Sequence, residues 1–408
     1  MAARGKPGFE AHSANPEIRD HRQGARARDG VERLSYPLGT APAPACAIPV
    51  AKGIYWARIP LPWALDHINV YLFDDGDGWT IVDTGAQGNR GRDAWAALEQ
   101  AVLGDKPVTR VIATHMHPDH VGLAGWLVDR HGSADLAATP HFHMPQAEYL
   151  LAHLLWFGAS HALPENEIAF LLRAGVDPQM ESMIRAHGYG NYKKGVSALP
   201  SSYHRLADGQ VLTLAGRRWQ VVIGRGHSPE HACLACLDEP LFLSGDQVLP
   251  GITSNVSVYA REPDANPLAH WLLSLERLQD IPGDPLVLPS HGRVFRGLHR
   301  RLYDLSQGHL EKLADLWRHL QAGPCSVVAC FPALYRREIK GLDFFLALGE
   351  AVAHLNLLMA VGLVARDRGG PVDHYVATGR LDPDQLMPRI RALPGEGLPA
   401  LAMAAGTV

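Results

Sequence analysis

The sequence of 408 residues contains few cysteines, no excess of basic residues and no long apolar run. Five cysteines are an odd number in a chain of this size, which argues against a disulfide framework and favours a reducing compartment. The net charge of -4 gives no reason to expect tight binding to nucleic acid or to anionic lipid. No stretch reaches the roughly 20 apolar residues of a membrane span, and the polar N-terminus lacks the apolar core of a secretory signal. We therefore expect a cytoplasmic protein without a membrane partner.

The cysteines also do not form a recognisable metal site. Cys233 and Cys236 make a single C-x-x-C within the apolar run ACLACL, and no second pair accompanies them. In a strand, residues three apart point to opposite faces of the sheet. We therefore expect two core cysteines on different faces rather than a zinc knuckle.

The chain divides into segments of different composition. Residues 1–45 are polar and rich in Pro and Gly, so we expect a disordered N-terminal tail. Residues 46–297 contain the apolar, β-branched runs and are the expected catalytic domain. Residues 298–380 are mostly helical and end in two short strands around a Gly-Gly turn, a pattern typical of a small winged-helix-like domain. Residues 381–408 are rich in Pro and Ala and are expected to be a peripheral tail.

Within the catalytic domain, two strand-rich halves flank a helical insertion. The first half predicts three strands, a helix and a short strand that ends in HMHPDH, followed by a strand over 134–140 and a helix over 146–157. Residues 160–200 predict two helices and a loop rich in Gly, Tyr and Lys. The strand pattern then resumes over 210–246 and in PLVLPSH. The fold class is therefore α+β, with two sheets covered by helices.

Four motifs carry side chains that bind metal ions, and each motif follows an apolar strand. Neutral imidazoles and carboxylates are the ligands that zinc and similar cations accept. One histidine in a loop is far more often a surface residue, but the joint occurrence of these motifs at strand ends favours a metal site. The motifs are T-H-M-H-P-D-H at 114–120, G-H-S-P-E-H at 226–231, S-G-D at 244–246 and S-H-G at 290–292.

The spacing within the motifs allows two metal ions at one site. His115 and His117 are alternate residues, so their imidazoles can point the same way and share one ion. Asp119 can turn toward a second ion together with its neighbour His120. An aspartate such as Asp246 can bridge two ions with its two oxygens.

With these motifs the sequence resembles the metallo-β-lactamase superfamily, whose signature is H-x-H-x-D-H with a later His, a bridging Asp and a final His. The resemblance covers about residues 53–295. It implies a four-layer αββα sandwich that here carries the helical insertion 160–200. The later motifs are most similar to the hydroxyacylglutathione hydrolase and lactamase-beta-like-protein branches, and the winged-helix-like segment resembles the C-terminal domain of the latter.

The resemblance also implies a cofactor of two divalent metal ions. Zinc is the expected ion, and iron or manganese are the alternatives. The first ion would take the residues of the family that match His115, His117 and His227. The second would take those that match Asp119, His120 and His291, and Asp246 would bridge the two.

The implied function is a hydrolase in which a dinuclear metal-bound hydroxide attacks an ester, thioester or lactone carbonyl. Asp119 is then both a metal ligand and the catalytic residue that orients the nucleophile. The alternatives are a two-metal phosphodiesterase or ribonuclease, a mononuclear iron persulfide dioxygenase, and a binding protein without activity. The acidic net charge counts against a ribonuclease, and a complete ligand set counts against a protein without activity. A Ser-His-Asp hydrolase is set aside because the sequence has no G-x-S-x-G turn.

Side chains outside the ligand motifs are candidates for contact with a small-molecule substrate. They are His143, which follows the strand expected at 134–140, and Tyr189, Tyr192 and Lys193 in the insertion. A solvated side chain is the competing interpretation for each of them. His231 is expected to lie behind the ligands rather than to be one.

The insertion and the C-terminal segment have expected roles of their own. Residues 160–200 are expected to form a helical cap over the metal site, with Ile168, Leu171 and Leu172 close to an apolar part of the substrate. Residues 298–380 are expected to pack on the catalytic domain or to mediate a homodimer. No compact basic run in this segment predicts binding of nucleic acid.

Overall fold

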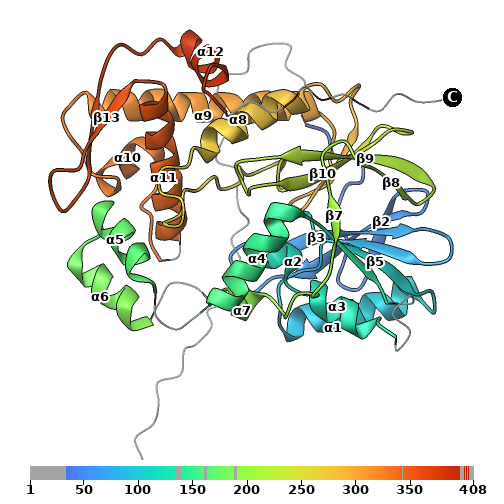
Figure 1. Ribbon diagram of the computed structural model, residues 1–408. Helices are drawn as coiled ribbons and strands as arrows, with labels where there is room; N and C mark the ends of the chain where they lie inside the picture. The colour runs from blue at the N-terminus through green and yellow to red at the C-terminus, as the bar shows by residue number, and fades with distance from the viewer. Residues whose placement is uncertain are drawn as a thin grey trace, which may run out of the picture. The chain divides into compact units, whose positions relative to one another are not determined.

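The computed structural model describes residues 34–133, 139–159, 163–187, 191–341 and 343–395, together with residues 399, 401 and 403. Within these ranges the chain forms two β sheets with helices on their outer sides and a separate β hairpin near the C-terminus (Figure 1).

The first sheet has seven strands, which follow chain order from one edge to the other. Neighbours from β1 to β4 are antiparallel, and those from β4 to β7 are parallel. Turns and short loops connect the antiparallel neighbours, whereas the parallel ones require helical crossovers. The strands are β1 (Ala47–Ala51), β2 (Ile54–Pro60), β3 (His67–Asp74), β4 (Trp79–Val82), β5 (Val108–Ile112), β6 (His141–Pro145) and β7 (His204–Leu206).

The sixth strand corrects one expectation. A strand was expected over 134–140, but β6 begins at His141, and residues 134–138 lie outside the described part of the chain. In β6, Phe142 and Met144 are buried under the helices, while His141 and His143 point to the other face. The two histidines therefore belong to the alternation of a strand rather than to a motif that follows one.

The second sheet has five strands in the order β12-β11-β10-β9-β8. β11 and β12 are parallel, and the other neighbours are antiparallel, so β9, β11 and β12 all run in the same direction. Their carboxyl ends therefore lie along one edge of the sheet. The strands are β8 (Val211–Leu214), β9 (Arg217–Gly224), β10 (His231–Cys236), β11 (Leu241–Gly245) and β12 (Leu286–Pro289).

The two sheets pack face to face through a shared apolar layer. This layer joins Trp56 and Phe73 of the first sheet to Trp219 and Leu234 of the second. The rings of Phe73 and Trp219 meet edge to face, with centroids 5.4 Å apart. Cys236 faces this layer, whereas Cys233 lies in the core on the opposite side of the second sheet. The prediction that the two cysteines lie on different faces is confirmed.

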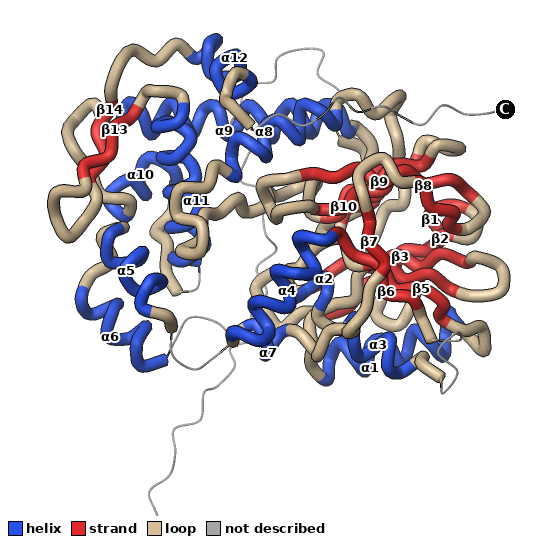
Figure 2. The backbone as a smooth tube through the Cα atoms, viewed as in Figure 1, coloured by secondary structure: helices blue, strands red, loops and turns tan. Residues whose placement is uncertain are grey.

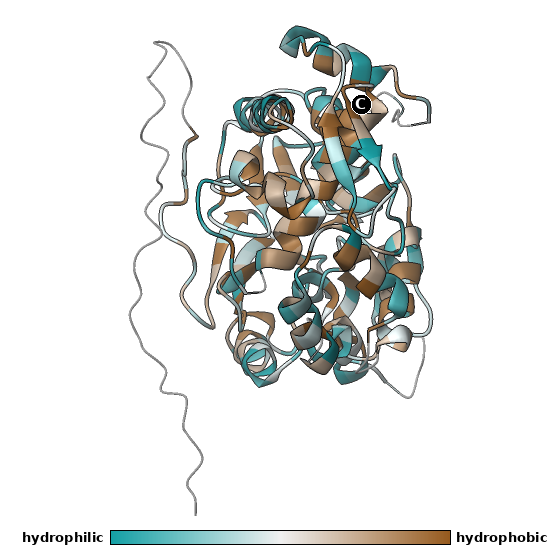
Figure 3. Cartoon of the chain, turned by 90° about the vertical axis from the view of Figure 1, so that its left-hand side faces the viewer, coloured by the Kyte–Doolittle hydropathy of each residue, from teal (hydrophilic) through white to brown (hydrophobic). Residues whose placement is uncertain are grey.

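Helices cover the outer face of each sheet, which completes four layers (Figure 2). The helices on the first sheet pack against it with Trp95, Leu127 and Tyr149. Apolar residues lie toward the interior and polar residues toward the outside (Figure 3). The expected αββα arrangement is therefore confirmed. The covering helices are α1 (Asn89–Leu98), continued by a π-helical turn at Glu99–Leu103, α3 (Ala124–Arg130) and α4 (Gln146–Gly158) on the first sheet, and α8 (Pro267–Leu278) and α9 (Leu298–Leu320) on the second. A further helix, α11 (Asp343–Ala360), packs against α8 and α9.

The C-terminal region adds short elements around α9 and α11. They are a 3₁₀ turn at Val328–Cys330, α10 (Phe331–Leu334), β13 (Val364–Asp367), β14 (His374–Ala377), a 3₁₀ turn at Pro383–Gln385 and α12 (Leu386–Arg391). The two strands pair antiparallel as a hairpin. This order of helices and strands agrees with the pattern expected from the sequence.

The described parts of both expected tails belong to the folded protein. Tyr36 packs against the core, and the guanidinium of Arg293 lies 3.9 Å from the centroid of its ring. Near the other end, α12 buries Leu386 and Ile390 and pairs Arg391 with Glu276 of α8. Such segments have no periodicity of their own that would predict them, because only contacts with distant parts of the chain order them.

The insertion contains α5 (Glu165–Arg173), α6 (Pro178–His187) and α7 (Tyr192–Gly195). Ile168 and Leu171 of α5 are buried in one core with Val327 and Tyr375 of the C-terminal region, and Leu172 packs against the same core. α5 and α6 lie beside α10 and α11 in Figure 1. The expectation that these apolar residues cover a substrate is therefore corrected, because they form part of a packed interior.

Helix α11 concerns the expectation that no stretch of the sequence is as long and apolar as a membrane span. Among the described residues it is the one helix that is long and apolar enough to cross a membrane by length and composition. However, 61% of this segment is buried inside the protein, and its buried face belongs to the C-terminal core. Packing within the core accounts for its apolar sequence.

Candidate metal centre

The seven predicted ligands lie together where loops from both sheets meet. His115 and His117 follow β5, and His120 lies in the short helix α2 (Pro118–Val121). Asp119 lies in the same short helix. The remaining three ligands follow the three strands of the second sheet that run in the same direction. They are His227 after β9, Asp246 after β11 and His291 after β12. Because the carboxyl ends of these strands lie along one edge, their loops converge.

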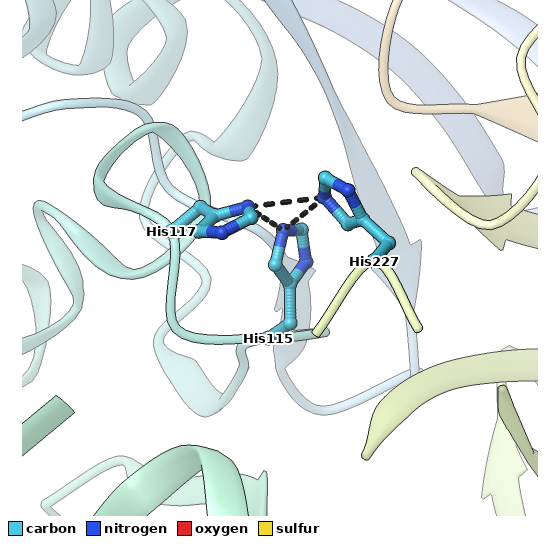
Figure 4. A group of neighbouring side chains, drawn as sticks. All are labelled: His115, His117 and His227. Atoms are coloured by element: carbon cyan, nitrogen blue, oxygen red, sulfur yellow. Dashed lines mark hydrogen bonds between the residues drawn. The ribbon is translucent and has the colours of Figure 1, made fainter. Parts of the chain in front are cut away.

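Three histidines form the first group (Figure 4). The Nε2 atom of His115 lies 2.9 Å from Nδ1 of His117 and 3.2 Å from Nε2 of His227. The last pair, His117 Nδ1 and His227 Nε2, is separated by 3.0 Å. Three ring nitrogens therefore point at one another, a geometry typical of three imidazole ligands that share one ion.

The second group consists of Asp119, His120 and His291. The Nε2 atom of His291 lies 3.2 Å from Oδ2 of Asp119, and that of His120 lies 3.6 Å from the same oxygen. Asp246 lies between the groups. Its Oδ2 is 3.4 Å from His227 Nε2 and 3.5 Å from His120 Nε2, and its Oδ1 is 3.4 Å from His291 Nε2. One carboxylate thus contacts both groups.

The hydrogen bonds on the outer side of the ligands fix their tautomers. Nδ1 of His227 donates to the backbone oxygen of Asn255 at 2.8 Å, and Nδ1 of His291 donates to that of His67 at 2.8 Å. Nδ1 of His120 lies 2.8 Å from a carboxylate oxygen of Asp83. In its neutral form, each of these rings therefore carries its proton outward and directs a lone pair inward.

The inward atoms lack partners within the described part of the protein. Nε2 of His120, Nε2 of His291 and Oδ1 of Asp246 are buried without a hydrogen bond. Buried polar atoms are rarely left in this state, so each requires an explanation. The donor set fits two divalent cations, and metal ions at the two groups would satisfy these atoms.

Burial in the site favours neutral imidazoles at His115 and His117, and the neighbouring histidines favour an ionised carboxylate at Asp119. Burial lowers the pKa of His117 to about 3. Burial alone would raise the pKa of Asp119, but the neighbouring His120 and His291 lower it to about 2. For His291 the opposite holds, because Asp246 raises its pKa against the effect of burial. In the metal-free site, protons on the imidazoles thus compensate the carboxylates.

Asp83 supports the second group and was not singled out from the sequence. Its carboxylate accepts hydrogen bonds from the backbone N–H of Thr114 at 2.8 Å and from the ring of His120 at 2.8 Å. Its backbone has a φ of 62°, in the left-handed region. Asp tolerates this region better than most residues. The signal in the sequence was the polar V-D-T-G at the end of a strand, which contains no metal-binding pattern.

Two further buried residues support the ligand loops. Nε2 of His231 accepts the backbone N–H of Asp246 at 3.0 Å, so His231 lies behind the ligands, as expected. Gly245 makes this contact feasible, because a Cβ at this position would lie 2.3 Å from the ring of His231. Glu148 of α4 is fully buried and accepts the backbone N–H of Met116. This carboxylate could not be recognised from the sequence because it lies within an ordinary helical pattern.

The residues predicted to contact a substrate lie in different surroundings. His143 lies in β6, where its ring stacks on His204 with centroids 4.8 Å apart, and it is not a member of the ligand groups found among the described residues. The hydroxyl of Tyr192 donates to the backbone oxygen of Met116, within the ligand loop. The ammonium of Lys193 lies 4.4 Å from the ring centroid of Trp156. Tyr189 lies outside the described residues.

Another group with ligand-type side chains lies in the C-terminal region, formed by His309, Glu350 and His354. Nδ1 of His309 is 3.3 Å from Nε2 of His354, whose Nδ1 donates to the backbone oxygen of Glu350 at 2.7 Å. The ammonium of Lys312 lies 2.8 Å from the carboxylate of Glu350. The Glu350 carboxylate is thus already paired with the Lys312 ammonium group. This pairing distinguishes the group from the ligand groups at the strand ends.

Two segments of the chain match known protein families. Residues 63–291, more than half of the chain, match the Metallo-beta-lactamase superfamily. Residues 313–377 match the Metallo-beta-lactamase-like, C-terminal domain. All seven predicted ligands lie within the first of these segments.

Similar proteins include a probable metallo-hydrolase, YqjP, of Bacillus subtilis (strain 168). It is 27% identical over 318 residues, which are 74% of this chain and 91% of the relative. An atrochrysone carboxyl ACP thioesterase of Aspergillus fumigatus is 24% identical over 59% of this chain and 41% of the thioesterase. The chain therefore spans less than half the length of that relative.

Solved structures with a similar fold include a beta-lactamase domain protein from Burkholderia ambifaria. It is 39% identical, with a TM-score of 0.76, and the match covers 85% of this chain and 98% of that one. The metallo-beta-lactamase family protein TTHA1429 from Thermus thermophilus is 26% identical, with a TM-score of 0.67 over 81% of this chain and all of that one (100%).

Proposed function

The chain belongs to the metallo-β-lactamase superfamily and is a metallo-hydrolase, and from this premise we propose that it hydrolyses a carboxylic ester, thioester or lactone at a dinuclear metal site. The observation that carries the proposal is the position of Asp246, whose two oxygens contact imidazoles of both ligand groups. A single ion would leave one of these groups without a cation.

The two groups would bind one cation each, with Asp246 between them. When bound, the cations supply a water of lowered pKa and positive charge for a carbonyl oxygen. The chain's own contribution begins with the tautomers of His120, His227 and His291, whose outward hydrogen bonds direct the lone pairs into the site.

Asp119 is proposed to orient the attacking nucleophile through a hydrogen bond to its carboxylate. Its pKa of about 2 means that the carboxylate is ionised at neutral pH, so it can accept a hydrogen bond from the water. The side chain is 15% exposed, which leaves an edge of the carboxylate open to the substrate side. The buried Asp83 does not share this access.

Among the three bond types, we favour a thioester. Several relatives are named as acyl-carrier thioesterases, and the sequence motifs resemble hydroxyacylglutathione hydrolases, which also cleave thioesters. Zinc is the proposed ion because three imidazoles in the first group suit it.

The C-terminal elements α9 to α11 and the β13–β14 hairpin support a winged-helix-like arrangement that serves packing rather than binding of nucleic acid.

The test combines elemental analysis of the purified protein with a substrate panel of acyl thioesters, p-nitrophenyl esters, lactones and bis-p-nitrophenyl phosphate. We expect close to two metal ions per chain, turnover of the acyl thioesters and loss of activity after chelation. Asp119→Asn should lower kcat by roughly 10²-fold, as expected when the nucleophile loses its orientation.

The alternatives give different results in the same panel. Turnover of bis-p-nitrophenyl phosphate alone would replace the proposal with a phosphodiesterase. One iron per chain together with oxygen consumption on a persulfide would replace it with a dioxygenase. A stable metal-free protein with undiminished hydrolysis would contradict any role of the metal.

A further inference from the structure

His115 and His117 must point to the same ion, and the backbone between them contains only Met116. Two peptide units link the two rings, and each has a polar group that faces the protein interior. One is the backbone N–H of Met116 and the other is its backbone oxygen. Both have a partner from a different part of the fold.

The N–H group is bonded to Glu148 of α4. Oε2 of Glu148 accepts the N–H of Met116 at 2.9 Å, and its Oε1 accepts the N–H of Glu230 at 2.6 Å. Glu230 lies in the loop that carries His227. One fully buried carboxylate therefore binds the loops of all three histidines in the first group.

The contact between α4 and the His227 loop is reciprocal. The carboxylate of Glu230 accepts the backbone N–H of Ala147 at 2.9 Å, while Glu148 accepts the N–H of Glu230. Ala147 lies in the first turn of α4, where N–H groups have no partner within the helix. The end of α4 and the loop therefore satisfy each other's backbone groups.

The backbone oxygen of Met116 is bonded to the hydroxyl of Tyr192. Tyr192 lies in α7, at the end of the insertion, and backbone hydrogen bonds fix its position. Gln87 donates to the backbone oxygen of Gly195 at 2.8 Å, and Ser197 donates to that of Gly122 at 2.8 Å. Through Tyr192 the insertion thus contacts the ligand loop at the backbone oxygen of Met116.

We propose that Glu148 and Tyr192 are positioning residues that set the direction of the His115 and His117 imidazoles and thereby the metal affinity of the first group. Without their hydrogen bonds the Met116 peptides can rotate, and the two imidazoles lose their common direction. Outer residues of this kind typically change metal affinity by about 10- to 100-fold when they are replaced. The proposal rests on the metal site proposed above but not on the bond that the enzyme cleaves.

The test measures metal affinity in the full-length protein. Wild type and variants are stripped with a chelator and titrated with Co²⁺, whose visible absorption reports the geometry of its ligands. Competition with a chromophoric chelator gives the affinity for Zn²⁺. His117→Ala identifies the binding step that belongs to the first group, because it removes one ligand of that group.

We expect Glu148→Gln to weaken that step by about 10- to 100-fold and to alter the Co²⁺ spectrum, because glutamine has one acceptor oxygen for two N–H groups. Glu148→Ala should weaken metal binding at the first group further. Tyr192→Phe retains the ring and removes one donor, so we expect a smaller change of about 10-fold and a folded protein. Excess Zn²⁺ should restore the hydrolysis rate of Tyr192→Phe.

Two matched controls separate positioning from general stability. Glu167 of α5 is a buried carboxylate that pairs with Arg261, and Tyr335 donates to a backbone oxygen of α11 at 2.9 Å. Glu167→Gln and Tyr335→Phe should leave the Co²⁺ spectrum and the Zn²⁺ affinity unchanged. The proposal is wrong if Glu148→Gln and Tyr192→Phe both bind Zn²⁺ as the wild type does, or if the controls weaken binding equally.

Discussion

Asp246 contacts both ligand groups, whereas His291 contacts only the second. Removing the bridging carboxylate should therefore weaken both metal sites, and removing the terminal imidazole should mainly empty the second. We expect Asp246→Ala to retain well under one ion per chain and His291→Ala to retain close to one. Elemental analysis after gel filtration gives the counts. Equal metal loss in the two variants would contradict the bridging assignment.

Asp83 contributes through His120 rather than through the metal itself. Asp83→Asn removes one carboxylate oxygen beside Nδ1 of His120 and keeps a residue type that accepts the backbone φ of 62°. We expect about 10- to 100-fold weaker binding at the second group, with little change in the unfolding temperature of the metal-free protein. Asp83→Ala serves as the comparison, because it adds backbone strain to the same loss. Unchanged Zn²⁺ affinity in Asp83→Asn would show that the ring of His120 needs no such support.

At the scale of single residues, the sequence predicts the ligands but not their supports. His115, His117 and His120 lie within six positions of one another, so local spacing reveals them. Asp83 and Glu148 act on the same loop through hydrogen bonds that span 37 and 32 positions of the chain. Each lies in a local pattern typical of a strand end or a helix, and only the folded arrangement brings it to the loop.

At the scale of elements, strands and helices with a clear period were predictable, and those shaped by distant contacts were not. β3 and β10 are apolar runs bounded by turns and match their expected positions. α5 has helical periodicity, but the sequence could not show which surface its apolar residues contact. The structure places Ile168 and Leu171 against the C-terminal region.

The position of Ile168 predicts a stability effect without a metal effect. Ile168 is 2% exposed and lies in the core shared with the C-terminal helices. Ile168→Ala should lower the free energy of unfolding by about 2–5 kcal/mol, the usual cost of such a cavity. Denaturant titration measures this loss, and Zn²⁺ affinity should remain that of the wild type. A stable variant with altered preference between small and bulky substrates would instead support the role as a cap.

At the scale of the whole molecule, the distribution of charge argues against nucleic acid as a partner. The net charge of -4 is accompanied by ion pairs in the C-terminal region, where Arg366 and Arg368 both contact Asp264. We expect no binding of DNA or RNA at nanomolar concentration in a fluorescence anisotropy assay. Tight binding that weakens steeply with salt would contradict this, because such a slope reports phosphate contacts.

The metal site also joins the two halves of the sandwich. His115, His117 and His120 follow a strand of the first sheet, whereas His227, Asp246 and His291 follow strands of the second. Each ligand group contains residues from both sheets. A bound cation therefore links the sheets at their edge and stabilises the folded state relative to an unfolded chain without a formed site.

This linkage predicts that unfolding depends on the concentration of free metal. Without the ions, the negative charge of the buried carboxylates is balanced by protons on the neighbouring imidazoles. This balance stabilises the site less than metal coordination does. We expect the chelated protein to unfold at a lower temperature. Each tenfold rise in free Zn²⁺ above the dissociation constant should add about 1.4 kcal/mol of stability per site. Calorimetric scans across a series of Zn²⁺ buffers measure this slope. Because the Asp246→Ala variant should show little of it, an equal slope in that variant would mean that the stabilising ions bind elsewhere.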